Sequence, residues 1–236
     1  MAEERDIRLM KKVPLFGKMK DEEVAQVVDQ CVRRECAKDQ VILVEEETGQ
    51  TLFIILKGTV KISRTSDEGK EVILTILKAG DFFGELSLLD GKGRSATVIS
   101  MEDSELLTLR RSEFLLLIER FPLISIELLK VLANRLRKAD EQIENLTLQD
   151  AVGRIGATII HVAEQTGYRR GESMIIQKLP VQQDLANMAG TARETISRVI
   201  AVFEEKKLIE RDGHRVVIRD FDGFKANYWK INEPND

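Results

Sequence analysis

Four polar side chains in the last third of the chain recur at helical spacing. They are Arg193, Glu194, Ser197 and Arg198. On a helix that turns about 100° per residue, all four fall on one face. An arginine fork can donate to O6 and N7 of a guanine, and a glutamate can accept from the amine of a cytosine. The pattern therefore predicts a helix whose exposed face contacts base edges in DNA.

Two structural roles compete with base contact for the same side chains. Thr191 and Glu194 have the spacing of a capping box, in which side chains satisfy the backbone donors at the start of a helix. Glu194 and Arg198 stand four residues apart and can form a surface ion pair. Both alternatives stay open on these residues alone.

A second polar group surrounds a glycine in the first half of the chain. It comprises Gly84, Glu85, Arg94 and Ser95. Gly84 permits a tight turn, and the free N–H groups of the helical turn after it can bind an anion. Arg94 offers a planar fork for phosphate, and Glu85 can accept from a sugar hydroxyl. The group favours a phosphorylated sugar as ligand, against the alternative that Glu85 and Arg94 merely pair across a loop.

The composition is that of a globular protein without a membrane segment. The 236 residues are 43% hydrophobic and 32% charged, and this length allows one or two domains. The longest apolar runs are too short to span a bilayer, and no signal-type segment opens the chain. Two cysteines, Cys31 and Cys36, give no disulfide framework. We expect a cytoplasmic protein that does not associate with membranes.

The charge balance excludes bulk attraction as the source of DNA binding. The net charge is −4, and residues 151–236 carry 13 Lys and Arg against 12 Asp and Glu. Any DNA contact must therefore come from local placement of arginines. The sequence also shows no nucleophile–base pair, metal-ligand spacing or Walker loop, and its histidines, His161 and His214, are far in sequence from Gly84. We expect no enzymatic activity and no bound metal.

Short strands must position the glycine-centred group. They are expected at residues 41–44, 52–56, 59–63, 71–77, 97–100 and 104–109. Strands of this length, separated by turn residues, indicate an all-β sandwich or barrel. Residues 6–36, which precede them, are predicted to be helical, with Cys31 inside the first helix.

A long helix is expected after the strands. Pro122 can occupy its first turn, and neither Pro nor Gly follows before Leu148. Apolar residues then recur at alternating spacings of three and four: Leu129, Leu132, Leu136, Ala139, Ile143 and Leu146. This a/d seam with charged flanks favours a parallel coiled-coil homodimer over a helix that packs only on its own core.

The last part of the chain predicts a helix, a turn at Gly190, a second helix and a hairpin. The helices are expected at residues 151–165, from 180, and at 192–206, and the hairpin at 208–218. This order is typical of a winged helix-turn-helix. The pattern gives no account of residues 221–236.

The sequence of residues 181–218 resembles the DNA-binding region of the cyclic-AMP receptor protein/FNR family of bacterial transcription regulators. That segment reads VQQDLANMAGTARETISRVIAVFEEKKLIERDGHRVVI. Residues 80–97, which contain GDFFGELSLL and GKGRSAT, resemble the phosphate-binding cassette of cyclic-nucleotide-binding β-rolls. The likeness covers about residues 10–220. It implies an α+β protein with an N-terminal double-stranded β-helix (a β-roll of jelly-roll type) at residues 1–121, a dimerisation helix at 122–148 and a winged helix-turn-helix at 149–236.

The resemblance also implies partners and their contact residues. A cyclic nucleotide, cyclic AMP, would be the allosteric ligand, and its binding residues would be Gly84, Glu85, Leu86, Arg94, Ser95, Ala139 and Asp140. Arg193, Glu194 and Arg198 match base-reading positions, so the homodimer would bind double-stranded DNA with palindromic TGTGA-like half-sites about 10–10.5 base pairs apart. RNA polymerase is a further expected partner, although the loop at residues 165–173 shows no motif for it.

One departure from the family pattern concerns the base of the nucleotide. Where the family presents adjacent threonine and serine to adenine, this chain has Ala139 and Asp140. Ala139 lacks a hydroxyl, whereas the carboxylate of Asp140 can accept from the exocyclic amine of adenine. The same carboxylate would repel the carbonyl oxygen of guanine. We therefore predict a preference for cyclic AMP over cyclic GMP.

Other members of the family suggest different effectors. Two cysteines are too few for a four-thiolate iron–sulfur cluster, and both histidines fall in the DNA-binding part, so we expect neither a cluster nor haem. A regulator whose β-roll is only scaffold, a regulator of another small ligand, and a nucleotide-binding module without DNA function stay open as alternatives.

Overall fold

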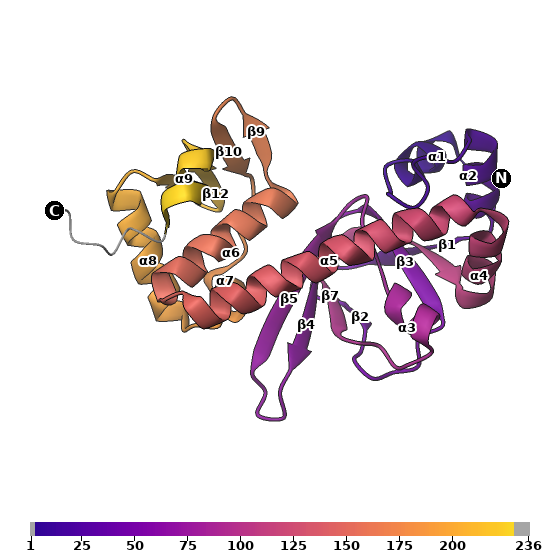
Figure 1. Ribbon diagram of the computed structural model, residues 1–236, viewed down its shortest axis with the longest axis horizontal. Coiled ribbons are helices and arrows are strands. Elements are labelled where there is room, and N and C mark those ends of the chain that lie inside the picture. Colours follow the sequence, from indigo (N-terminus) through magenta and orange to yellow (C-terminus); the bar gives the residue numbers. More distant parts are fainter. Residues whose placement is uncertain (1–2, 229–236) are drawn as a thin grey trace. The chain divides into compact units, whose positions relative to one another are not determined.

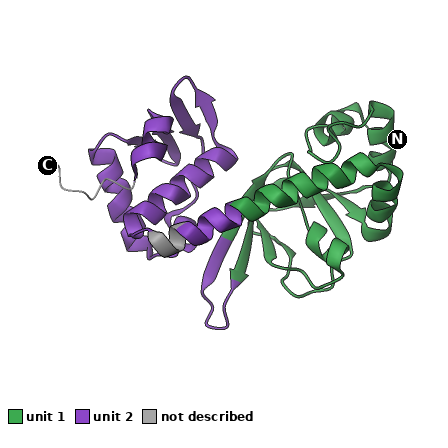
Figure 2. Ribbon diagram, in the orientation of Figure 1, with its two compact units in different colours: residues 1–64, 74–137 green, residues 65–73, 138–236 purple. Residues whose placement is uncertain are grey.

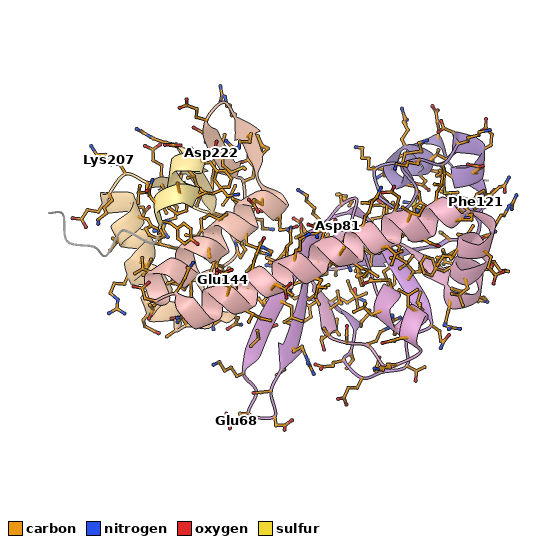
Figure 3. All side chains as sticks on the ribbon, viewed as in Figure 1. Glu68, Asp81, Phe121, Glu144, Lys207 and Asp222 are labelled. Carbon is orange, nitrogen blue, oxygen red and sulfur yellow. The ribbon has the colours of Figure 1, made fainter. Side chains whose placement is uncertain are left out.

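The chain forms two compact units in the computed structural model. The structure describes residues 3–228, except for the side chains of residues 145–148. The first unit comprises residues 1–64 and 74–137, and the second comprises residues 65–73 and 138–236 (Figure 2). One long helix, α5 (Pro122–Leu148), contributes to both units, as its colour in Figure 2 shows, and it carries Glu144 in Figure 3.

Two four-stranded sheets form the β-sheet portion of the chain (Figure 1). The first sheet has the order β1 (Val32–Cys36), β8 (Ser104–Arg110), β3 (Thr51–Lys57), β6 (Phe82–Phe83). The second has the order β2 (Val41–Leu43), β7 (Thr97–Ser100), β4 (Thr59–Thr65), β5 (Glu71–Lys78). Their central strand pairs, β3 with β8 and β4 with β7, are antiparallel. Figure 3 marks Glu68 at the turn between β4 and β5. The expected all-β arrangement is confirmed.

Strand β3 is buried on both of its faces. Phe53 and Ile55 belong to the apolar core that also holds residues of β7 and β8. Leu52, Ile54 and Leu56 point the other way, into the core that the helices of this unit share. Because successive side chains of a strand alternate between faces, burial on both sides explains why residues 52–56 are an unbroken apolar run.

Helices pack on the second of these cores. They are α1 (Glu4–Met10), α2 (Asp21–Asp29), α4 (Arg111–Arg120) and the first turns of α5, while the short α3 (Glu85–Asp90) follows β6. The expectation of helix throughout residues 6–36 is wrong at its end, because residues 32–36 form β1. Cys31 lies past the end of α2 and not inside it, and burial raises the pKa of its thiol to about 12.

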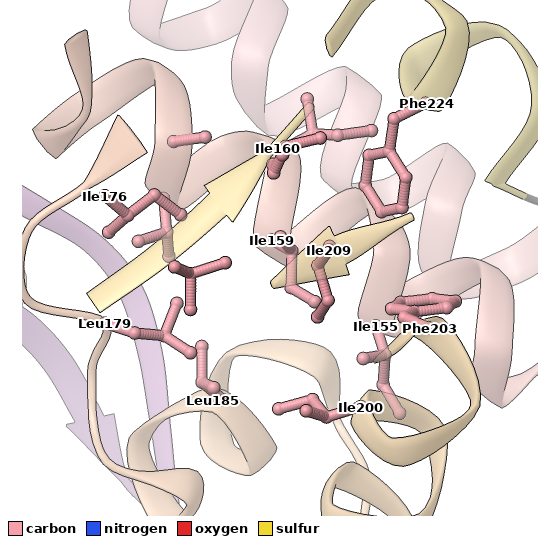
Figure 4. Close-up of a cluster of buried hydrophobic side chains, with 14 of the residues drawn as sticks. Ile155, Ile159, Ile160, Ile176, Leu179, Leu185, Ile200, Phe203, Ile209 and Phe224 are labelled. Atoms are coloured by element: carbon pink, nitrogen blue, oxygen red, sulfur yellow. The ribbon is translucent and has the colours of Figure 1, made fainter. Parts of the chain in front are cut away.

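The described residues of the second unit form four further helices and a four-stranded sheet. The helices are α6 (Ala151–Thr166), α7 (Gln182–Ala189), α8 (Arg193–Glu205) and α9 (Phe221–Asn227). The sheet has the order β11 (Ile209–Asp212), β12 (Arg215–Ile218), β10 (Ser173–Ile176), β9 (Tyr168–Arg170). One apolar core joins helices and sheet (Figure 4). The predicted helix, turn, helix and hairpin are confirmed, whereas the β9–β10 hairpin and α9 were not predicted.

Helix α5 presents a row of uncovered apolar side chains. The row follows heptad spacing through Ile126, Leu129, Ala133, Leu136 and Ile143, and the polar Asp140 interrupts it before Ile143. The Ile and Leu members of this row are between 48% and 65% exposed. Leu132 instead packs against the core of the first unit, so the seam expected through Leu132 is shifted, and the side chain of Leu146 lies outside the described residues. No helix in the described part of the chain is long and apolar enough to cross a membrane.

Candidate functional site

A left-handed glycine forms the turn between β6 and α3. Gly84 has φ +83° and caps the N-terminus of α3. A Cβ atom at this position would lie 2.7 Å from Nη1 of Arg94 and 3.0 Å from the carbonyl oxygen of Thr51. Glycine therefore serves both the backbone conformation and the close approach of the arginine.

Three protein acceptors hold the side chain of Arg94 in place. Its side chain is 5% exposed and donates to the carbonyl oxygens of Gly84 and Thr51 and to Oγ of Ser87, each at 2.8 Å. Its backbone pairs with Glu46 and Glu47 in the loop after β2. Burial lowers the pKa of the guanidinium, and the carboxylates of Glu85 and Glu47 oppose that shift. The result is a rigid, buried cation suited to a phosphate.

Glu85 supplies a buried acceptor beside this cation. The residue is 2% exposed, and its Oε1 accepts from Nη1 of Arg135 at 2.7 Å. Its Oε2 is buried with no hydrogen-bond partner in the described structure. Within that structure Glu85 forms no ion pair with Arg94, so the pairing alternative is wrong. A buried acceptor without a donor fits a sugar hydroxyl, because an unsatisfied buried oxygen is costly.

Arg135 belongs to this group, and the sequence interpretation missed it. From α5 its guanidinium donates to Glu85 and, at 2.6 Å, to the carbonyl oxygen of Phe82, and it lies 5.0 Å from the centre of the Phe82 ring. A usable signal was its place on the helix: it follows Leu128 and Val131 by seven and four residues, on the face that packs on the core. A charge on an apolar face needs a buried partner.

The other expected ligand residues are exposed. Leu86 stands on α3, and Ser95 lies in the bend that follows Arg94. Ala139 and Asp140 follow Arg135 along α5 by four and five residues. The described part of the chain contains no cluster of His, Cys, Asp and Glu that could hold a metal.

The predicted base-contacting residues share the exposed face of α8. The four are Arg193, Glu194, Ser197 and Arg198, and all are exposed. The opposite face, which includes Ile196 and Phe203, is buried in the core of the second unit. The hydroxyl of Ser197 donates to Oε1 of Gln182 on α7 at 2.7 Å, so α7 orients that part of the face.

Both alternative roles for these side chains are absent from the described structure. Ala192 is the N-cap of α8 and makes no side-chain cap, so the capping box with Thr191 does not form. The described contacts include no ion pair between Glu194 and Arg198, and Arg198 reaches only Oγ1 of Thr195, at 3.5 Å. These side chains stay available to a partner.

A groove of about 510 Å³ lies between α7, the start of α8 and the β11–β12 hairpin. Its polar lining comes from Gln182, Gln183, Arg193, Arg211 and His214. Donor and cationic side chains in a groove beside the base-contacting face suit a phosphate backbone. Arg193 is also one of the residues that the sequence predicts to contact bases.

Two family models match the chain. The model for the cyclic nucleotide-binding domain matches residues 33–121, and that for the Crp-like helix-turn-helix domain matches residues 153–226. The chain is 35% identical over 211 residues to the "Cyclic AMP receptor protein" of Thermus thermophilus. The matched residues make up 89% of this chain and 94% of that protein.

Solved structures share the fold. The catabolite activator protein of Thermus thermophilus superposes with a TM-score of 0.53 at 33% identity, over 92% of this chain and 99% of that one. The c-di-GMP responsive regulator CLP of Xanthomonas campestris superposes with a TM-score of 0.71 at 20% identity, over 84% of this chain and 99% of that one. The expected α+β architecture is confirmed.

Proposed function

Because the chain belongs to the cyclic-AMP receptor protein/FNR family of cyclic-nucleotide-binding transcription regulators, we propose that cyclic AMP controls its affinity for operator DNA. The main support for the proposal is that a buried cation, Arg94, lies beside a buried carboxylate oxygen of Glu85 that has no hydrogen-bond partner in the described structure. Arg94 would bind the cyclic phosphate, and Oε2 of Glu85 would accept from the ribose hydroxyl. The proposal assigns the chain no catalytic step.

The remaining ligand residues follow from the same assignment. Backbone N–H groups at Glu85 and Leu86 would face the phosphate after the turn at Gly84, and Ser95 would add a hydroxyl. Ala139 and Asp140 would meet the base. Since the Asp140 carboxylate accepts from the amine of adenine and repels the carbonyl oxygen of guanine, cyclic AMP is preferred over cyclic GMP.

The DNA partner is proposed to be a palindrome bound by a homodimer. The exposed row on α5 supports dimerisation, since apolar side chains at heptad spacing are stabilised when a second helix covers them. Two copies of α8 would then place Arg193, Glu194, Ser197 and Arg198 in successive major grooves, over TGTGA-like half-sites. RNA polymerase is the proposed further partner, and the cytoplasm the proposed location.

The proposed division of labour is a β-roll sensor at residues 1–121, a dimerisation helix at 122–148 and a DNA-binding domain at 149–236. The terminal residues 1–2 and 229–236 lie outside the described structure. Ligand can change DNA affinity only by binding the DNA-competent conformation more tightly than the other. The junction at residues 149–150, where Asp150 caps α6, is the proposed hinge.

A DNA-binding titration with and without cyclic AMP, at one fixed salt concentration, tests this function. We expect tighter operator binding with cyclic AMP. Arg94→Ala should lose this response, because removal of a charge-assisted fork lowers ligand affinity by about 100-fold or more. Arg64→Ala, at an exposed arginine on β4, is the matched control and should keep the response.

Further outcomes separate the alternatives. Arg198→Ala should abolish specific DNA binding with and without ligand. Operator binding that is tight and indifferent to cyclic AMP, cyclic GMP and cyclic di-GMP would identify an effector-independent regulator. Cyclic AMP binding without any operator binding would identify a nucleotide-binding module and refute the DNA assignment.

A further inference from the structure

The C-terminal helix α9 connects α8 with the residue that follows α5. Phe224 of α9 is buried, and its ring meets Phe203 of α8 edge-on, with ring centres 5.5 Å apart (Figure 4). Past the end of α9, the hydroxyl of Tyr228 accepts from Nε2 of Gln149 at 3.1 Å. The rings of Phe224 and Tyr228 lie 6.1 Å apart, so the contacts form one continuous path.

The Gln149 side chain is folded against the start of α6. A Cβ atom on Gly153 would lie 2.7 Å from Oε1 of Gln149, so this close packing needs glycine. That Oε1 is buried with no partner in the described structure. The backbone oxygen of Gln149 accepts from Nη1 of Arg154 at 3.0 Å. Tyr228 thus satisfies the amide of a side chain that is otherwise poorly satisfied.

Tyr228 also packs closely on α6. A Cβ atom at Gly156 would lie 2.3 Å from Cδ2 of Tyr228, so the absence of a side chain at Gly156 admits the ring. Helix α9 itself is firmly attached to its unit. Asp220 caps it, and Asp222, labelled in Figure 3, pairs through both oxygens with Arg169.

We propose that α9 and Tyr228 form a strut that holds Gln149, and with it the α5–α6 junction, in one conformation relative to α8. The strut sets how strongly cyclic AMP changes DNA affinity, and in this respect the inference rests on the proposed function. Tyr228 touches neither base-contacting nor cassette residues, so it is a positioning residue. Loss of its hydroxyl removes one hydrogen bond from one hinge conformation and shifts the hinge equilibrium by about fivefold.

The test measures operator affinity of the full-length protein with and without cyclic AMP. Tyr228→Phe changes the ratio of the two dissociation constants by about fivefold. Tyr168→Phe is the matched control: its hydroxyl accepts from Gln177 in the same unit, and it should keep the wild-type ratio. Gly156→Ala should reproduce the effect by displacing the ring, and Gln149→Ala should abolish any further effect of Tyr228→Phe.

A second measurement separates the strut from ligand control. Amide hydrogen exchange of residues 150–156, measured without DNA, should be faster in Tyr228→Phe than in Tyr168→Phe at equal melting temperature. If the wild type ignores cyclic AMP and exchange still rises, ligand control fails and the strut stands. If the wild type responds to cyclic AMP but Tyr228→Phe leaves the ratio of dissociation constants unchanged, the strut is refuted. It is also refuted if the wild type does not respond to cyclic AMP and Tyr228→Phe leaves hydrogen exchange unchanged.

Discussion

Glu46 has a backbone conformation that residues other than glycine rarely adopt. Its φ is +68°, in the left-handed region, and its N–H donates to the carbonyl oxygen of Arg94 at 2.8 Å. The conformation costs a residue with a Cβ atom about 1–2 kcal/mol, which glycine avoids at an entropic cost of about 0.5–1 kcal/mol. The strain sits in the loop that fixes Arg94.

We predict that Glu46→Gly raises the free energy of unfolding by about 0.5–1 kcal/mol, measured by urea denaturation. Glu47→Gly is the matched control, because the neighbouring residue does not share the left-handed backbone, and it should give no increase. An equal rise in both variants would show that the effect comes from removing a negative charge.

His161 predicts a pH dependence of stability. Its Nε2 is buried without a partner in the described structure, and burial, helped by the charge of Lys138, lowers the pKa of the imidazole while Glu164 opposes the shift. The unfolded chain therefore binds the proton more readily than the folded one. Stability should be complete above about pH 6.5 and fall as the pH drops below that value.

His161→Gln should reduce this fall, measured as the midpoint of urea unfolding across the pH range. The same change at His214, which is exposed in the β11–β12 turn, is the matched control. The assignment fails if His161→Gln retains the full pH dependence of the wild type.

At the level of residues, types and spacing located the cassette but not all of its members. Glu85 and Arg94 could be found because a carboxylate and a fork after a glycine turn suggest a ligand. The spacing of Arg135 on α5 indicates that it needs a buried partner, but it does not identify Glu85, which is fifty residues away and is brought to Arg135 by the packing of α5 on β6. Tyr228 was missed for the same reason, because its contacts come from tertiary packing.

Among the elements, α5 carries a testable surface. Leu129 is 65% exposed in the row that we assign to the dimer. Leu129→Lys should raise the dimer dissociation constant by about 100-fold or more, because two ammonium groups would be buried against apolar side chains. Asn134→Lys adds the same charge at another exposed position of the helix.

Sedimentation velocity across a concentration series measures both variants. We expect Leu129→Lys to be monomeric where the wild type and Asn134→Lys are dimeric. A wild type that sediments as a monomer would refute the assignment of the exposed row.

Most of the elements that the sequence did not predict are polar strands at the edges of sheets. Strand β1 reads VRREC and buries only Cys36, and β9 reads YRR with every residue exposed. An edge strand with few buried side chains lacks the alternation that identifies strands. The observed exposed row differs from the predicted seam at Leu132. Its spacing allows it on either face of α5, and its contact with the core of the first unit decides which face it occupies.

For the whole molecule, the proposed dimer predicts a strict operator geometry. One DNA turn separates the two half-sites, so insertion of five base pairs between them rotates one site to the opposite side of the duplex. We expect affinity to fall by about 1,000-fold or more, to the non-specific level. Fluorescence anisotropy with cyclic AMP at fixed salt measures the change, and a control duplex with five substituted central base pairs keeps the spacing. Equal binding to the lengthened duplex would refute the paired contact.

Strand β3 has a consequence for how the β-roll can respond at all. Its five consecutive apolar residues form the common wall of two cores, one between the sheets and one beneath the helices. Thr51, at its first position, also supplies a carbonyl that fixes Arg94. A disturbance that reaches this wall from the cassette therefore cannot stay on one side of it. Because close-packed side chains transmit displacements, a shift of β3 would displace side chains both between the two sheets and in the layer of helices.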